Sequence, residues 1–151
     1  MARIADAIAG TMPRDRTELH NPAYQAYQIL HVAFVVAPLV AGIDKFTKLL
    51  VNWDIYLAPS VDRMLGGRGH EFMLVVGVIE IVAAIGVALW PRVFGYVVAA
   101  WLLGIIGNLM LIPGYYDVAL RDLGLALGAL ALARLARTYS APWPWDRQDA
   151  R

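Results

Sequence analysis

Three long apolar runs that are almost free of charge constrain the fold of this chain most strongly. Residues 23–43 hold no charged side chain over 21 positions, residues 93–112 hold none over 20, and residues 72–90 hold one, Glu80, over 19. A helix needs roughly 20 residues to cross the hydrocarbon core of a bilayer. Buried helices of soluble domains normally keep a polar stripe, whereas the run at 93–112 has Asn108 as its one strongly polar side chain. The sequence therefore predicts an integral membrane protein.

A fourth span is predicted from a shorter apolar run at residues 123–133. This run covers 11 residues, and it reaches membrane length only when it is extended back to Tyr115 across three charged positions. Three helices alone would leave its leucines and alanines with nothing to bury them. We therefore expect four membrane helices, near residues 24–48, 70–90, 92–112 and 116–138.

The predicted fold is all-α, an integral membrane four-helix bundle at residues 23–138 between an N-terminal segment, 1–22, and a C-terminal tail, 139–151. The cytoplasmic loops of membrane proteins carry an excess of Lys and Arg. With four spans, the side that holds both termini has eight of these residues and the opposite side has five. We therefore expect a multi-pass protein with both termini in the cytoplasm.

The loop between the first two spans, from Asp44 to Glu71, has a helical pattern of its own. Asn52 fits the N-cap position of a helix, and Pro59 would break or kink the run. Six large apolar side chains fall near the spacing of one helical face; they are Trp53, Tyr56, Leu57, Val61, Met64 and Leu65. We expect short amphipathic helices within residues 52–65 that lie on the outer membrane surface or cap the bundle.

The composition excludes several classes of function. Apolar residues make up 60% of the chain and charged residues 17%, against ~45–50% and ~25% in soluble domains. The chain has no cysteine, which argues against thiol catalysis, iron–sulfur clusters and thiolate metal sites. Glu80 and His31 alone are too few ligands for a metal site. The net charge of +1 gives no sign of a nucleic-acid partner, so the partner that the composition predicts is the lipid bilayer.

Glu80 is the most unusual residue of the apolar runs, because an ionisable side chain at membrane depth needs a partner or a purpose. It is the ninth residue of its 19-residue span, and Met73, Gly77 and Ala84 share its helical face. Small residues let a neighbouring helix approach closely, so we expect Glu80 to point into the bundle. The polar residues that we expect in the same outer half of the bundle are Asp44, Lys45, Asn108, Arg121 and Asp122.

Two interpretations of these six residues stay open. One is a network of ion pairs and hydrogen bonds that fixes the register of the helices. The other is a polar pocket that binds a small polar or quinone-like head group or passes protons. Adjacent residues on a helix diverge by about 100°, so Lys45 is not expected to pair with Asp44, nor Arg121 with Asp122. We expect pairs between helices, joining Lys45 to Glu80 or Asp122 and Arg121 to Asp44 or Glu80.

Several short motifs occur in an order that resembles one known family. They are GIDKF at residues 42–46, GVIEI at residues 77–81 and ALRDL at residues 119–123. The Gly-x-x-Lys step, the mid-helix glutamate and the Arg-Asp pair follow one another over roughly residues 27–136. In this order and spacing the chain resembles the DoxX-like family of small bacterial four-helix membrane proteins.

The resemblance implies a four-helix bundle in the bacterial inner (cytoplasmic) membrane. Some members of that family are described as subunits of a thiosulfate:quinone oxidoreductase and others as membrane partners of thiol and oxidative-stress enzymes, while most have no assigned activity. Because this chain lacks cysteine, we expect no thiol chemistry and no intrinsic cofactor. A quinone is the candidate ligand, and a redox centre would have to reside on a protein partner.

Two functional hypotheses follow. The first is a non-catalytic subunit or membrane anchor of a respiratory or redox assembly, with a polar pocket that faces a quinone. The alternative is a stand-alone membrane protein that binds or transports a small solute or protons, with Glu80 as the switching carboxyl.

Overall fold

The computed structural model describes residues 20–140, and this part of the chain contains helices and no strand. The predicted all-α fold is confirmed. The helices in chain order are α3 (Pro22–Thr47), the 3-10 helix η1 (Trp53–Tyr56), α4 (Pro59–Met64), α5 (Gly69–Leu89), α6 (Pro91–Leu109) and α7 (Tyr116–Tyr139). The four long helices agree with the predicted ranges to within three residues at every end. Most of the predicted segment 1–22 and of the predicted tail 139–151 lies outside the described residues.

The ends of α3 follow from local chemistry. The side chain of Asn21 accepts a hydrogen bond from the backbone N–H of Ala23 at 2.9 Å, and Pro22 occupies the first turn, where its missing N–H costs nothing. The helix ends where Lys48 adopts the left-handed conformation, with φ 52°, and donates its N–H to the carbonyl of Asp44. The chain therefore turns sharply at this point and starts back toward α5.

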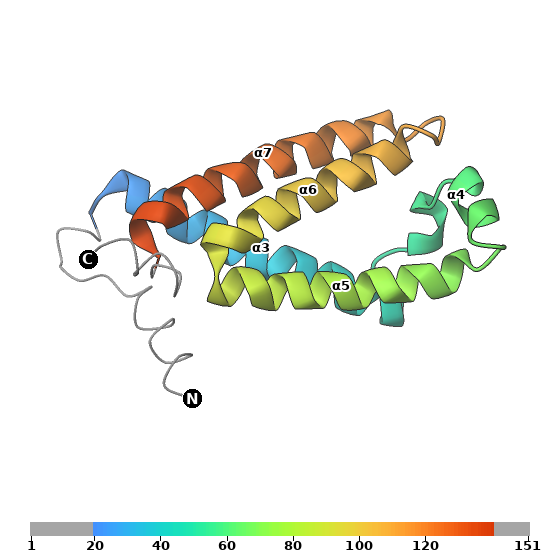
Figure 1. Ribbon diagram of the computed structural model, residues 1–151, viewed down its shortest axis with the longest axis horizontal. Coiled ribbons are helices and arrows are strands. Elements are labelled where there is room, and N and C mark those ends of the chain that lie inside the picture. The colour runs from blue at the N-terminus through green and yellow to red at the C-terminus, as the bar shows by residue number, and fades with distance from the viewer. Residues whose placement is uncertain (1–19, 141–151) are drawn as a thin grey trace, which may run out of the picture.

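The four long helices form a bundle of two closely packed pairs (Figure 1). Contacts are most extensive between α6 and α7 and between α3 and α5, and they are fewer between α3 and α7 and between α5 and α6. The pairs diverge toward the end that carries η1 and α4, which lie between the ends of α5 and α6. We call this the loop end, and the end where α3 begins and α7 finishes the terminal end.

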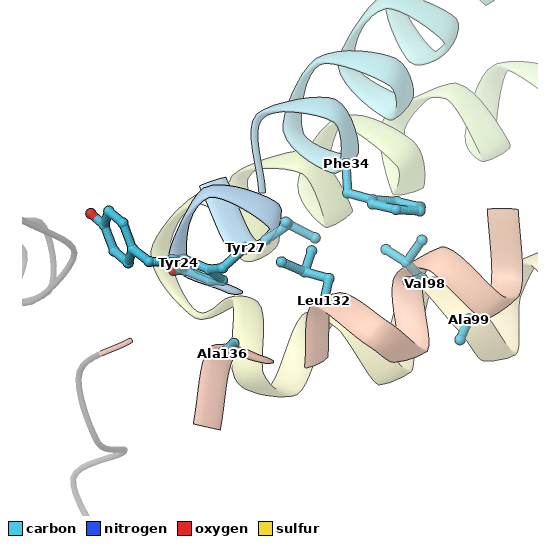
Figure 2. Packing of buried hydrophobic residues seen from close by; sticks show 9 residues of the cluster. Tyr24, Tyr27, Phe34, Val98, Ala99, Leu132 and Ala136 are labelled. Atoms are coloured by element: carbon cyan, nitrogen blue, oxygen red, sulfur yellow. The ribbon is translucent and has the colours of Figure 1, made fainter. Parts of the chain in front are cut away.

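A compact apolar core holds the two helix pairs together at the terminal end (Figure 2). Tyr27 and Leu132 are completely buried there, beside the buried Phe34. Small residues bring α6 and α7 together, because a Cβ added at Gly95 would lie 2.9 Å from the Cβ of Ala133. The loop end has no comparable apolar core among the described residues, so other contacts must connect the two helix pairs there.

Three helices, α3, α5 and α6, are long and apolar enough to cross a membrane. Large apolar side chains stay exposed along them, including Ile29 (70%), Val82 (56%) and Leu103 (54%). Water would penalise so much exposed apolar surface, whereas lipid would not. The chain is therefore a membrane protein whose apolar helix faces contact the bilayer. Among the described residues α7 does not meet the same measure of length and hydropathy.

Candidate functional site

The central feature of the loop end is a buried ion pair between α3 and α5. The Nζ atom of Lys45 donates to Oε2 of Glu80 at 2.5 Å, and the two side chains are only 2% and 11% exposed. Glu80 thus faces the protein, as predicted, and Lys45 is one of the two bases expected to pair with it. A buried ion pair is favourable only when good geometry and further contacts offset the loss of hydration.

Two glycines explain why the pair can form. A Cβ at Gly42 would lie 2.7 Å from the carbonyl oxygen of Gly77, and a Cβ at Gly77 would lie 2.9 Å from the carbonyl oxygen of Gly42. The backbones of α3 and α5 therefore touch at this crossing. Lys45 and Glu80 each follow their glycine by three residues, which is almost one helical turn, so the same crossing brings both charges into contact.

Asp44 organises the chain that leaves α3 and does not pair with another long helix. Its carboxylate accepts the backbone N–H groups of Leu49 at 2.8 Å, Leu50 at 3.0 Å and Val51 at 3.4 Å. It also accepts the indole N–H of Trp53 at 2.8 Å. The expected contact between Asp44 and Arg121 is therefore wrong. Within residues 20–140, N–H groups of the loop already surround the carboxylate of Asp44.

Trp53 belongs to the site, although its spacing in the sequence predicts only a place on the apolar face of the loop. The ammonium group of Lys45 lies 3.8 Å from the centre of its ring, which is a cation–π contact. Trp53 thus covers Lys45 while its N–H is fixed by Asp44. The sequence signal was Asn52, whose side chain accepts the N–H of Asp54 at 3.2 Å and starts the short helix η1.

Asn108 fastens the loop to α6 and does not contact Glu80 in the described structure. Its Oδ1 accepts the N–H of Ala58 at 2.9 Å, and its Nδ2 donates to the carbonyl of Tyr56 at 2.6 Å. Because Trp53 is held by α3 and residues 56–58 are held by α6, the loop ties the two helix pairs together where their apolar packing is weak.

We expect Asn108→Ala to free this part of the loop. The N–H of Ala58, a residue with no exposed surface, would lose its partner, and a buried donor that is left without a partner costs about 1–3 kcal/mol. Amide hydrogen exchange at Ala58 should become faster, while exchange in the middle of α7 stays unchanged. Equal exchange rates at Ala58 in the two proteins would contradict the assigned contact.

The expectation that Arg121 and Asp122 cannot pair, because they are neighbours on one helix, is wrong. The Nε of Arg121 donates to Oδ1 of Asp122 at 3.1 Å, since the long arginine side chain can bend around the helix. Asp122 is buried, with 7% of its side chain exposed, whereas Arg121 is 65% exposed. Among the described helices, Arg121 therefore does not form the predicted ion pair with Asp44 or Glu80. Of the two acids expected for Lys45, the structure pairs it with Glu80 and not with Asp122.

A second cluster of charged side chains lies on the surface beside η1. Asp54 accepts from the Nζ of Lys48 at 3.2 Å and lies 3.0 Å from Nδ1 of His70. Partial burial works to raise the pKa of Asp54, but hydrogen bonds and charge attraction from His70 and Lys48 outweigh it and hold this pKa below its ordinary value. The contacts join η1 to the end of α3 and the start of α5.

The depressed pKa of Asp54 predicts how these contacts respond to acid. They should be complete above the unfolded pKa of about 3.9 and should be lost as the pH falls through the lower pKa of the folded state. A spin label on Ile55→Cys, an exposed position of η1, should become more mobile over that pH range. With Asp54→Asn added, the label should be mobile at neutral pH and show no step. A step of the same size in both proteins would assign it to another group.

The predicted site residues therefore divide into three groups. Lys45 and Glu80 are brought together, Asp44 and Asn108 hold the covering loop, and Arg121 with Asp122 forms a separate pair on α7. No group of three His, Asp or Glu side chains suited to a metal ion occurs within residues 20–140. Compared with protein-family models, curated proteins and solved structures, the chain gives no match.

Proposed function

We propose that this protein is a DoxX-like, non-catalytic membrane subunit that anchors a respiratory or redox assembly. The observation that carries the proposal is that the polar groups at the loop end bind to one another and to the loop. Lys45 is bound to Glu80 and covered by Trp53, and Asp44 and Asn108 hold the loop backbone. Side chains held in this way support the helices and are not displayed toward a substrate, as expected of a scaffold.

The proposal includes α7 as a fourth span. Its buried positions, which include Ala119, Ala126 and Ala129, lie on one face. Large apolar side chains point away from the bundle on the other side, with Leu120 70% exposed and Leu127 60% exposed. An exposed leucine face of this kind supports contact with lipid. With four spans, the Lys and Arg distribution supports a cytoplasmic terminal end, and the resemblance to the DoxX-like family implies the inner membrane.

Purification of the tagged chain from its native membrane in a mild detergent tests the proposal. We expect a second protein that carries a redox cofactor to co-purify in a constant ratio. An unrelated membrane protein with the same tag should recover none of it. A chain that is isolated as a monomer or homodimer, with no such partner under any mild condition, would overturn the subunit assignment.

A double variant tests separately whether the subunit is non-catalytic. Lys45→Met with Glu80→Leu replaces the ion pair with apolar side chains, an exchange that buried pairs often tolerate. The variant should still recover the partner, and the assembly should keep its electron-transfer rate. Retained assembly with a lost rate would instead place the pair in the chemistry.

A quinone is the ligand that this proposal assigns to the assembly. Lys45 could offer a quinone carbonyl a hydrogen bond only if Trp53 moved aside. Organic extraction of the purified assembly should therefore recover quinone, and Trp53→Ala should raise the recovered amount, because the ring no longer covers Lys45. Extracts without quinone would remove this ligand from the proposal while leaving the anchor role intact.

Proton-coupled transport by the chain alone is the second candidate function. It is favoured because the partner of Glu80 is a lysine, Lys45. A lysine can give up a proton to a buried glutamate, whereas an arginine stays charged. The purified chain in liposomes that enclose a pH-sensitive dye should then conduct protons, and Glu80→Gln should abolish the flux. Liposomes with the same proton leak as protein-free controls would exclude this function.

A further inference from the structure

The lipid-facing surface of α3 continues beyond the end of the helix. Val40, Ile43 and Phe46 are 45%, 48% and 50% exposed along α3. The helix ends at Thr47, yet Leu49 and Leu50, which follow it, are 84% and 68% exposed. Two adjacent leucines with so much exposed surface are unusual for a loop in water, where turns favour Gly, Asn, Asp and Ser.

At the corner formed by residues 48–50, where the chain turns after α3, the backbone N–H groups have hydrogen-bond partners within the protein. The N–H groups of Leu49 and Leu50 both donate to Oδ1 of Asp44, and that of Lys48 donates to the carbonyl of Asp44. A backbone N–H without a partner is costly in an apolar medium, which normally keeps irregular chain out of lipid. Asp44 removes this cost from inside the fold while the leucine side chains face outward.

We propose that Leu49 and Leu50 form an anchor in the interfacial layer of the bilayer, which places the start of the covering loop in lipid and not in the aqueous space. The occupant of this surface is lipid, because the surface is continuous with the lipid-contacting face of α3 and its backbone donors are satisfied internally. Lys48 lies beside the leucines with its side chain 42% exposed, and its ammonium group is paired with Asp54 of the covering loop. The anchor does not depend on a redox partner.

The absence of cysteine from the chain allows a direct test with single spin labels. Leu50→Cys would be labelled in the full-length protein, reconstituted in liposomes of phosphatidylethanolamine and phosphatidylglycerol. Collisions with oxygen, which concentrates in lipid, are compared with collisions with a water-soluble nickel chelate. The reference for lipid is Val40→Cys, and the reference for water is Arg68→Cys, whose native side chain is 73% exposed at the loop end.

We expect the ratio of oxygen to nickel collisions at Leu50 to exceed that at Arg68 severalfold and to approach that at Val40. A ratio equal to that at Arg68 would place the corner in water and overturn the proposal. Protection from both reagents would also overturn it, because a second copy of the chain would then cover the leucines. A label on Leu49→Cys gives an independent measurement if the first label disturbs the fold, which circular dichroism would reveal.

Discussion

Removal of the carboxylate in Glu80→Ala should destabilise the protein by about 3–5 kcal/mol, because it strands a buried charge. The ammonium group of Lys45, 2% exposed at its side chain, would keep Trp53 as a neighbour but lose its counter-charge. Neither water nor lipid head groups can reach it without opening the loop. Reversible unfolding in mixed detergent micelles, followed by circular dichroism, measures the change in the free energy of unfolding.

Two comparison variants separate the stranded charge from the loss of packing. Lys45→Met combined with Glu80→Leu should recover most of the stability, because no charge then remains buried. Arg134→Ala should have a small effect, since this exposed α7 residue can extend toward the membrane surface. Arg121→Ala should also have a small effect, because Arg121 is largely exposed and, within residues 20–140, pairs only with its neighbour. If Glu80→Ala destabilised the protein no more than Arg134→Ala, the ion pair would not be a support of the fold.

The second large effect is expected at the crossing of α3 and α5. Gly42→Ala would place a Cβ 2.7 Å from the carbonyl oxygen of Gly77 and 2.9 Å from a side-chain carbon of Ile81. The first of these atoms belongs to the backbone, so the helices must move apart. Overpacking of this kind costs about 1–3 kcal/mol, and the movement would also lengthen the contact between Lys45 and Glu80.

Gly104→Ala is the matched control for this substitution. Gly104 is also helical, but a Cβ there would meet no atom within 4 Å. Alanine favours the helix by about 1 kcal/mol over glycine, so the control should be neutral or slightly stabilising in the same unfolding experiment. Opposite signs for the two variants would identify steric contact as the cause. Equal effects would mean that the crossing is looser than described.

The long helices were predictable because their signals are local. Runs of about 20 uncharged residues, with prolines at the starts of α3 and α6, define the helices without knowledge of their neighbours. The inward direction of Glu80 was also predictable, since Gly77 marks the face on which another helix can approach. Periodicity relates residues of one helix in this way, and that is enough to orient each helix.

The detailed pairing within the site was less predictable, because it depends on chain outside the helices. Asp44 could equally have met a base across the bundle, but the left-handed turn at Lys48 brings three backbone N–H groups to its carboxylate first. The angle between successive helical positions excluded a contact between Arg121 and Asp122 only for short side chains, and arginine is long enough to reach. Neither the geometry of a loop nor the length of a side chain produces a periodic pattern in a sequence.

The position of the ion pair along the chain has a consequence for biosynthesis. Lys45, Glu80 and the covering Trp53 all precede residue 90, so the contact is complete within α3, the loop and α5. The first helical hairpin can therefore neutralise its own charges while the ribosome is still producing α6. Glu80 need not cross the translocation machinery into lipid as an isolated charge, and Asn108 arrives later to fasten a loop that is already closed.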